Sequence, residues 1–402
     1  MYCARKREKK ITNNIKSTTK IIQENSENQL MYMFHPTNSS IYQLFDEHSS
    51  IKLIKLKELI KSFQINYFHS IYQCDWIDHF VGRLERLISN NNNFEIQINA
   101  SKLFSVFIIQ IASDANNQFT EMVNRFFLPI IDDSSIQSNL RSIAIEIVTA
   151  AYFLSNQSHV NSIVRLMEMI KNILTNSIKT NDKEIKSFYA TAIQCWSLLF
   201  TILPWNLLEE IASPILSLST DLLANTNVIV RIEVGRCLAL IFERLSNEID
   251  DESFILEHYD RILREIKTLS EDRSKLRNKN EKLIQRDEFR EIFQSIQFRS
   301  NQFQQQEIHF GKETLTISNR IEECRYCFIR NILESGTFEH LQYNLTLRTI
   351  FHLGEPIDKE DLLILFPKIS KREKKLKNKQ NEKFNDLSKR NNSKHCNNEL
   401  DE

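Results

Sequence analysis

The chain alternates long apolar stretches with short polar breaks. From about Ile41, apolar residues recur at three- and four-residue spacing, a pattern that predicts amphipathic helices. Polar breaks at 89–93, 132–135, 180–182 and 225–227 each precede a strongly apolar helix, and these helices are expected to begin near Phe94, Ile136, Ile185 and Val228. The spacings of 42, 49 and 43 residues between these starts are typical of two-helix armadillo or HEAT repeats.

The predicted fold is therefore all-α: an armadillo/HEAT-like helical-repeat solenoid with a short helical C-terminal module and basic tails. Small residues mark places where neighbouring helices could approach closely: Ala100, Ser105, Ala144, Ala150, Ala192, Ser197, Gly235 and Ala239. A single two-helix unit cannot bury its apolar face alone, so a stack of units would share one core. A large compact helical bundle is the alternative, because four imperfect periods do not exclude it.

The pattern divides the chain into four segments. We expect a basic N-terminal extension (1–40), a helical-repeat domain (41–300), a C-terminal helical module (301–366) and a Lys-rich tail (367–402). Within the module, helical periodicity resumes through 321–333 and 341–353 after a loop around 300–306, and Gly354 and Pro356 end it.

A heptad-like run of apolar residues lies near the end of the predicted repeat domain. Its members are Ile262, Leu269, Leu276 and Leu283. The paired positions Ile266, Arg273, Asn280 and Asp287 are mostly polar, so we interpret the run as one ordinary helix with a narrow apolar edge and not as a zipper.

The composition disfavours most enzyme sites. Only 5 Gly and 6 Pro occur in 402 residues, and the glycines are isolated, so no loop could bring several backbone N–H groups onto a phosphate. No phosphate loop, zinc-protease helix, nucleophile elbow or dinucleotide fingerprint is present. The sequence predicts no catalytic residue, no cofactor and no small-molecule substrate.

The seven cysteines are scattered and predict reduced thiols, not a disulfide framework. Cys324 and Cys327 have zinc-ligand or redox spacing, but a tetrahedral site needs a second pair of ligands. The nearby candidates are His309, His340 and His352, which are scattered. On a helix the two cysteines would share one face and serve as small core residues, so we predict no metal site.

The apolar stretches are shorter than the roughly 20 residues that a membrane span needs. The first residues, MYCARKREKK, also lack the apolar core of a secretion signal. We therefore expect a soluble intracellular protein with no membrane partner.

Net charge is distributed unevenly, although 52 basic and 52 acidic side chains balance overall. Residues 1–20 carry +6 and 367–390 carry +7, whereas 21–366 carry −11. Cationic ends suit contact with a polyanion or with a nuclear import receptor, and solvated, disordered ends are the alternative. Short import-like motifs contain Lys6, Arg7, Lys9, Lys371, Arg372, Lys374, Lys375 and Lys377. We expect the protein in both nucleus and cytoplasm.

A basic segment stands out within this acidic body. Residues 273–290 include seven basic residues and three acidic ones. The basic residues are Arg273, Lys275, Arg277, Lys279, Lys282, Arg286 and Arg290. Five of them recur at i+3 and i+4 steps and would line one face of a helix: Lys275, Lys279, Lys282, Arg286 and Arg290. Such a stripe could follow phosphates in a salt-dependent way. It could equally be a solvated face, or neutralise acidic neighbouring repeats.

Three stretches, in order, resemble the interferon-related developmental regulator family. The first comprises 195–204 (CWSLLFTILP) and 227–245 (NVIVRIEVGRCLALIFERL); the second comprises 274–279 (SKLRNK) and 285–290 (QRDEFR); the third comprises 308–311 (IHFG), 333–336 (LESG), 340–342 (HLQ) and 347–354 (LRTIFHLG). The N-terminal extension, the Cys324/Cys327 pair and the Lys- and Asn-rich tail depart from the family pattern.

This resemblance implies an armadillo-like main body, a family-specific C-terminal module and no enzymatic activity. Members of the family are described as transcriptional co-regulators that associate with histone-deacetylase co-repressor complexes, and also as ribosome-associated regulators of translation. The implied partners are therefore proteins, including co-repressor components, or alternatively the ribosome or RNA. The family pattern matches the basic segment at Lys275, Arg277, Lys279, Arg286, Phe289 and Arg290, which are the residues expected to contact nucleic acid.

Overall fold

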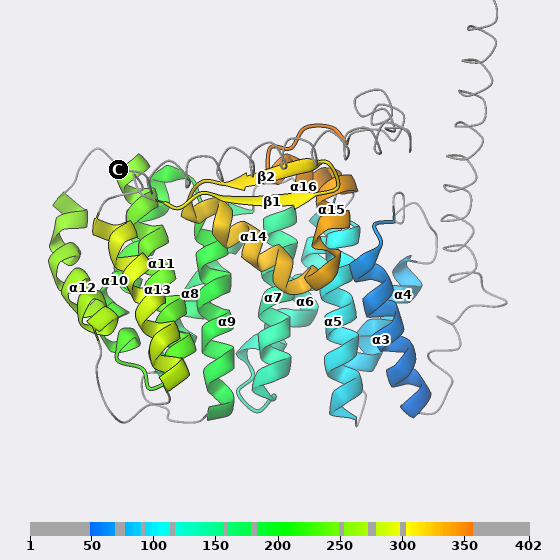
Figure 1. Ribbon diagram of the computed structural model, residues 1–402. Coiled ribbons are helices and arrows are strands. Elements are labelled where there is room, and N and C mark those ends of the chain that lie inside the picture. The colour runs from blue at the N-terminus through cyan, green and yellow to red at the C-terminus, as the bar shows by residue number, and fades with distance from the viewer. Residues whose placement is uncertain are drawn as a thin grey trace, which may run out of the picture. The chain divides into compact units, whose positions relative to one another are not determined.

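The computed structural model describes residues 49–68, 77–89, 93–112, 117–155, 159–177, 183–248, 253–271, 279–297 and 303–356. Apart from Pro356, these residues belong to one of the two compact units of the chain, Ile21–Glu355. The fold of this part is mostly helical (Figure 1). The predicted extension (1–40) and tail (367–402), with their import-like basic residues, lie outside the described residues, and the domain boundaries remain predictions.

Helices follow one another through the first three quarters of the described chain. They are α3 (Ser49–Ile65), α4 (Ile77–Ser89), α5 (Phe94–Gln110), α6 (Asn117–Asp132), α7 (Ser138–Leu154), α8 (Val160–Ser177), α9 (Lys183–Phe200), α10 (Leu208–Leu223), α11 (Val228–Glu248), α12 (Ser253–Glu271) and α13 (Lys279–Gln297). The short 3-10 helix η2 (Trp205–Leu207) precedes α10. The starts of α5, α7, α9 and α11 lie within two residues of those predicted from the polar breaks.

The helices pack in a regular local order. Each even-numbered helix from α4 to α12 packs against the odd-numbered helix that follows it. The odd-numbered helices also pack on one another in sequence, from α3 through α5, α7, α9 and α11 to α13. Figure 1 shows α5, α7 and α9 standing side by side in this row.

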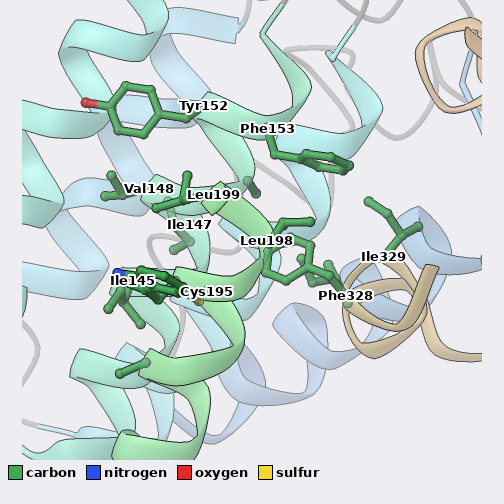
Figure 2. Packing of buried hydrophobic residues seen from close by; sticks show 14 of the residues in the cluster. Ile145, Ile147, Val148, Tyr152, Phe153, Cys195, Leu198, Leu199, Phe328 and Ile329 are labelled. Atoms are coloured by element: carbon green, nitrogen blue, oxygen red, sulfur yellow. The ribbon is translucent and has the colours of Figure 1, made fainter. Parts of the chain in front are cut away.

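Burial explains why the row is so apolar. Helix α7 is covered by α5, α6 and α9, and twelve of its seventeen residues are buried. In Figure 2, Phe153 of α7 approaches Phe328 of a later helix, and their ring centroids are 6.4 Å apart. The predicted close approach at Gly235 is confirmed: a Cβ added to Gly235 of α11 would lie 2.9 Å from Ile292 Cδ1 of α13.

The expected single helix through the heptad-like run is wrong. Helix α12 ends at Glu271 and α13 begins at Lys279, and the two pack side by side. Gln285 Nε2 donates to the Leu269 carbonyl at 3.3 Å, whereas sixteen residues of continuous helix would separate them by about 24 Å. Ile262 and Leu269 of α12 pack in the core, whereas Leu283 of α13 is half exposed and Leu276 lies outside the described residues, so the seven-residue spacing does not mark one continuous apolar edge.

The C-terminal module is not purely helical, which corrects the all-α expectation. Strands β1 (Gln306–Phe310) and β2 (Glu313–Ile317) form an antiparallel hairpin before α14 (Arg320–Leu333), the 3-10 helix η3 (Glu334–Gly336), α15 (Thr337–Tyr343) and α16 (Leu345–Ile350). The Gly311-Lys312 loop, with Gly311 at φ +58°, suits a two-residue hairpin. Alternation in Thr314–Ile317 buries Leu315 and Ile317, a strand signal that the helical reading missed.

The module lies across the row and does not extend it. Helix α14 contacts α3, α5, α9 and α11. His340 of α15 donates from Nε2 to the Phe63 carbonyl at 3.1 Å, because a carbonyl can only accept. Asn344 donates to the Ile109 carbonyl at 2.9 Å, and Arg325 to the Thr201 carbonyl at 3.0 Å. These carbonyls lie at or just beyond the C-terminal ends of α3, α5 and α9, where helices leave backbone acceptors unpaired.

No helix in the described part of the chain is both long enough and apolar enough to cross a membrane.

A substitution at Gly336 tests how closely the C-terminal module approaches α3. A Cβ at Gly336 would lie 1.6 Å from the Gln64 carbonyl oxygen, so Gly336→Ala should lower the free energy of unfolding by about 1–3 kcal/mol. Gly82→Ala is the matched control: nothing lies within 4 Å of its added Cβ, and alanine in the interior of α4 should add about 0.5–1 kcal/mol. Urea denaturation measures both; equal effects would contradict the close contact.

His340 should make the docked module sensitive to acid. Burial lowers the pKa of His340 from 6.5 to about 4. Between these values the unfolded chain binds more protons, so stability falls as the pH drops, by about 2 kcal/mol at pH 5. His340→Gln keeps an N–H donor but cannot titrate, so it should lose less stability than the wild type between pH 7 and pH 5 in urea denaturation. His79→Gln on the exposed side of α4 should behave like the wild type.

Candidate functional site on helices α11, α13 and α14

Helix α13 is fixed in place by its buried face. Phe289, Ile292 and Ile296 are buried against the preceding helices. Gln285 is also buried; its side-chain oxygen accepts a hydrogen bond from Arg231 of α11, while its amide donates to α12. Because an amide can accept and donate at once, one side chain ties α13 to both neighbours.

One flank of α13 is acidic, and its charges are paired. Glu288 accepts from Arg236 Nη2 of α11 at 2.8 Å, and Glu291 accepts from Arg320 Nη2 of α14 at 2.8 Å. Arg320 is only 5% exposed, so its guanidinium depends on the carboxylates of Glu291 and Glu323 for the interactions that water no longer supplies.

The other flank carries the predicted nucleic-acid-binding side chains that the structure describes. Arg286 and Arg290 are 41% and 58% exposed, and both lie 3.6–3.7 Å from the exposed Asp287. Lys279 and Lys282 belong to the first turn of the same helix. Arg273, Lys275 and Arg277 lie outside the described residues, so the structure unites only part of the predicted stripe.

Two exposed apolar residues lie near the start of the same helix. Leu283 is 50% exposed and Ile284 is 55% exposed. Sequence analysis placed Leu283 on the narrow apolar edge of a helix and gave Ile284 no role. Apolar periodicity alone assigns such residues to the core, so only the helix orientation shows that they face solvent.

A polar cavity of about 220 Å³ lies beside the acidic flank, between α9, α11 and α14. Its charged lining consists of Glu233, Arg236, Arg320 and Glu323. Arg236 bonds to Glu233 at 3.1 Å as well as to Glu288, and Arg320 bonds to Glu323 at 2.7 Å as well as to Glu291. Two guanidinium groups therefore bridge four carboxylates, which leaves this network with a net charge of −2.

Burial and neighbouring charges have opposite effects on the pKa values of this network. Burial raises the pKa of Glu233, and Arg236 partly offsets that effect. Burial disfavours the charged form of Arg236, but the carboxylates of Glu233 and Glu288 outweigh it and raise the pKa of the guanidinium. The bridged arrangement holds the arginine charged.

Three cysteines line the same cavity, and sequence spacing predicted only two of them together. Cys237 of α11 joins Cys324 and Cys327 of α14. Burial raises the pKa of all three thiols, that of Cys237 to about 12. Raised pKa values describe protonated and weakly nucleophilic thiols, unlike the lowered values of reactive cysteines. Among the described residues, no group of three His, Cys, Asp or Glu side chains could hold a metal ion.

The sequence of this helical body matches a family model described as "Interferon-related developmental regulator (IFRD)" over residues 13–297. The match covers more than half of the chain and ends with the last residue of α13. This chain belongs to the interferon-related developmental regulator family. The C-terminal module, 303–356, follows the segment matched by the family model.

Individual members of the family give the same result. Human "Interferon-related developmental regulator 1" is 27% identical over 303 residues, which cover 73% of this chain and 66% of the relative. Mouse "Interferon-related developmental regulator 2" is 32% identical over 187 residues, covering 46% of this chain and 42% of the relative. The match to the human relative thus spans slightly less than two thirds of that protein.

The cavity cysteines should resist alkylation. With iodoacetamide at pH 7.5, buried Cys237 should remain unmodified in the native protein, and half-buried Cys324 should react far more slowly than in urea, because burial raises the pKa of both thiols. Buried Cys195 on α9 serves as an internal reference. Peptide mass spectrometry measures each site, and rapid native modification of Cys324 with Cys195 still protected would show an activated thiol.

Proposed function

We propose that this member of the interferon-related developmental regulator family is a non-enzymatic adaptor, built as an armadillo/HEAT-like solenoid, that acts as a transcriptional co-regulator through protein partners. The observation that carries this proposal is the row of odd-numbered helices, in which α5 to α13 are each covered by the even-numbered helix that precedes them. Local stacking of this kind creates long surfaces suited to binding other proteins.

The chemistry of the polar cavity supports a binding role over a catalytic one. Its arginines are engaged by carboxylates on both sides, and its thiols have raised pKa values. Such groups are poor nucleophiles or proton carriers near neutral pH. Co-repressor components are the proposed protein partners, and the basic ends of the chain support a proposed distribution between nucleus and cytoplasm.

RNA or ribosome binding is the second candidate function. It is favoured by the separation of charge on α13: Glu288 and Glu291 face their arginine partners, while Arg286 and Arg290 remain exposed on the other flank. An exposed row of guanidinium groups can contact phosphates and release counterions. In this proposal, Lys275 and Lys279 extend the contact toward the start of the helix.

Charge reversal at Lys275, Lys279 and Arg286 to Glu separates the two candidate functions. If the basic flank binds RNA, the variant should lose at least about ten-fold of its low-salt co-sedimentation with ribosomes in sucrose gradients, and the salt dependence should weaken. A matched triple reversal of the exposed Lys61, Lys102 and Lys267 should sediment like the wild type.

The same variants test the adaptor proposal by co-isolation of histone-deacetylase co-repressor components from nuclear extract. The adaptor proposal expects these partners to be retained by the wild type and by both reversal variants. Unchanged ribosome sedimentation of the first variant would remove the RNA candidate, and absence of co-repressor components from the wild-type isolate would remove the adaptor candidate as stated.

A further inference from the structure

In the described part of the chain, the hairpin of the C-terminal module has two strands only, so the outer edge of β1 is open. Strand β1 pairs with β2 on one side, and among the described residues its backbone makes no hydrogen bond beyond that pairing. Figure 1 shows β1 between β2 and α14. An unpaired edge of this kind presents a row of N–H and C=O groups that an extended peptide can extend as a further strand.

A groove of about 900 Å³ runs along this edge. It is lined by Glu307, Ile308 and His309 of β1 and by residues of α14, η3 and α15, but by none of β2. Consecutive strand residues point to opposite faces, so a groove that touches all three follows the edge of the strand. Across from β1, Tyr326 and the 49% exposed Phe338 supply apolar contacts.

The groove adjoins the polar cavity. Cys327 and Asn331, one helical turn apart on α14, line both spaces. At about 220 Å³ the cavity is smaller than the roughly 300–1,000 Å³ of sites for drug-sized ligands, and its size suits a single long side chain.

The charge of the combined surface indicates what kind of side chain fits. The charged groups that line the two spaces are Glu233, Glu307, Glu323 and Glu334 with Arg236, Arg320 and Arg330. Glu288 and Glu291 of α13 pair with two of these arginines from behind the lining, so six carboxylates accompany three guanidinium groups and, without His309, the ensemble carries −3. Complementary charge favours a cationic partner and disfavours an acidic one.

We propose that β1, α14 and the polar cavity form a docking site for an extended, basic segment of a partner protein, which adds a strand to β1 and inserts a Lys or Arg side chain between Glu233 and Glu323. Backbone hydrogen bonds supply the general affinity, and the inserted cation supplies the specificity. This site deepens the proposed adaptor function and rests on it, but it uses other residues than the basic flank of α13.

A synthetic peptide tests the site on the purified full chain, independently of any cellular partner. The probe is fluorescein-labelled Lys-Thr-Val-Arg-Val-Thr-Val-Lys, and its binding is measured by fluorescence anisotropy. We expect saturable binding, at least ten-fold weakening when the central Arg of the probe is replaced by Glu, and protection of the β1 amides from hydrogen exchange. A probe N-methylated at alternate residues keeps its charge but cannot pair fully with a strand, so it should also bind at least ten-fold more weakly.

Variants of the chain provide a second test of the docking site. Glu233→Gln combined with Glu323→Gln should weaken probe binding at least ten-fold, whereas the matched control Glu209→Gln with Glu210→Gln, on the exposed side of α10, should change it less than two-fold. Circular dichroism confirms that both variants are folded. Equal binding of the N-methylated probe, equal binding by the Glu233/Glu323 variant, or no binding at millimolar peptide would each overturn this site; loss of co-repressor isolation with intact probe binding would overturn only the adaptor function.

Discussion

The C-terminal ends of the odd-numbered helices impose the constraint on which this structure depends. Each helix end leaves carbonyl groups without intrahelical partners and carries partial negative charge. The ends of α3 and α5 lie together, since Gln110 donates to the Phe63 and Asn66 carbonyls. His340, Asn344 and Arg325 then bring donors to carbonyls on α3, on α5 and after α9. The module thus satisfies acceptors that the row exposes by stacking its helices in one direction.

The row of helices also pairs with unsatisfied backbone groups at the ends of α14. Gln64 of α3 donates to the Ile332 carbonyl in the last turn of α14 at 2.8 Å, and Glu243 of α11 accepts from the backbone N–H of Arg320 at its start. Both ends of α14 are therefore capped by the row that it crosses. Because these caps come from residues 64 and 243, the module ties the first described helix to α11 and restrains the intervening stack.

The distribution of charged side chains on α13 depends on this packing. Where α13 meets α11 and α14, its glutamates find buried or half-buried arginines, and where it meets solvent its arginines remain exposed. One helix thereby contributes to two surfaces of opposite character: a basic flank suited to phosphates and an acidic cavity suited to a cation. The separation supports two distinct binding proposals, and the protonated thiols of the cavity fit a binding surface better than a reaction centre.

Local sequence determined which segments are helical and where the central ones begin. Polar breaks placed the starts of α5, α7, α9 and α11 because helix boundaries depend on nearby capping and periodicity. Small residues such as Gly235 marked a close helix contact, because a residue without a side chain leaves room for a neighbouring helix. Only the tertiary structure decided that the 262–283 run belongs to two packed helices, that Glu288 and Glu291 face arginines while Arg286 faces solvent, and that Cys237 joins Cys324 and Cys327. These outcomes depend on contacts between residues far apart in the chain, which neither periodicity nor spacing encodes.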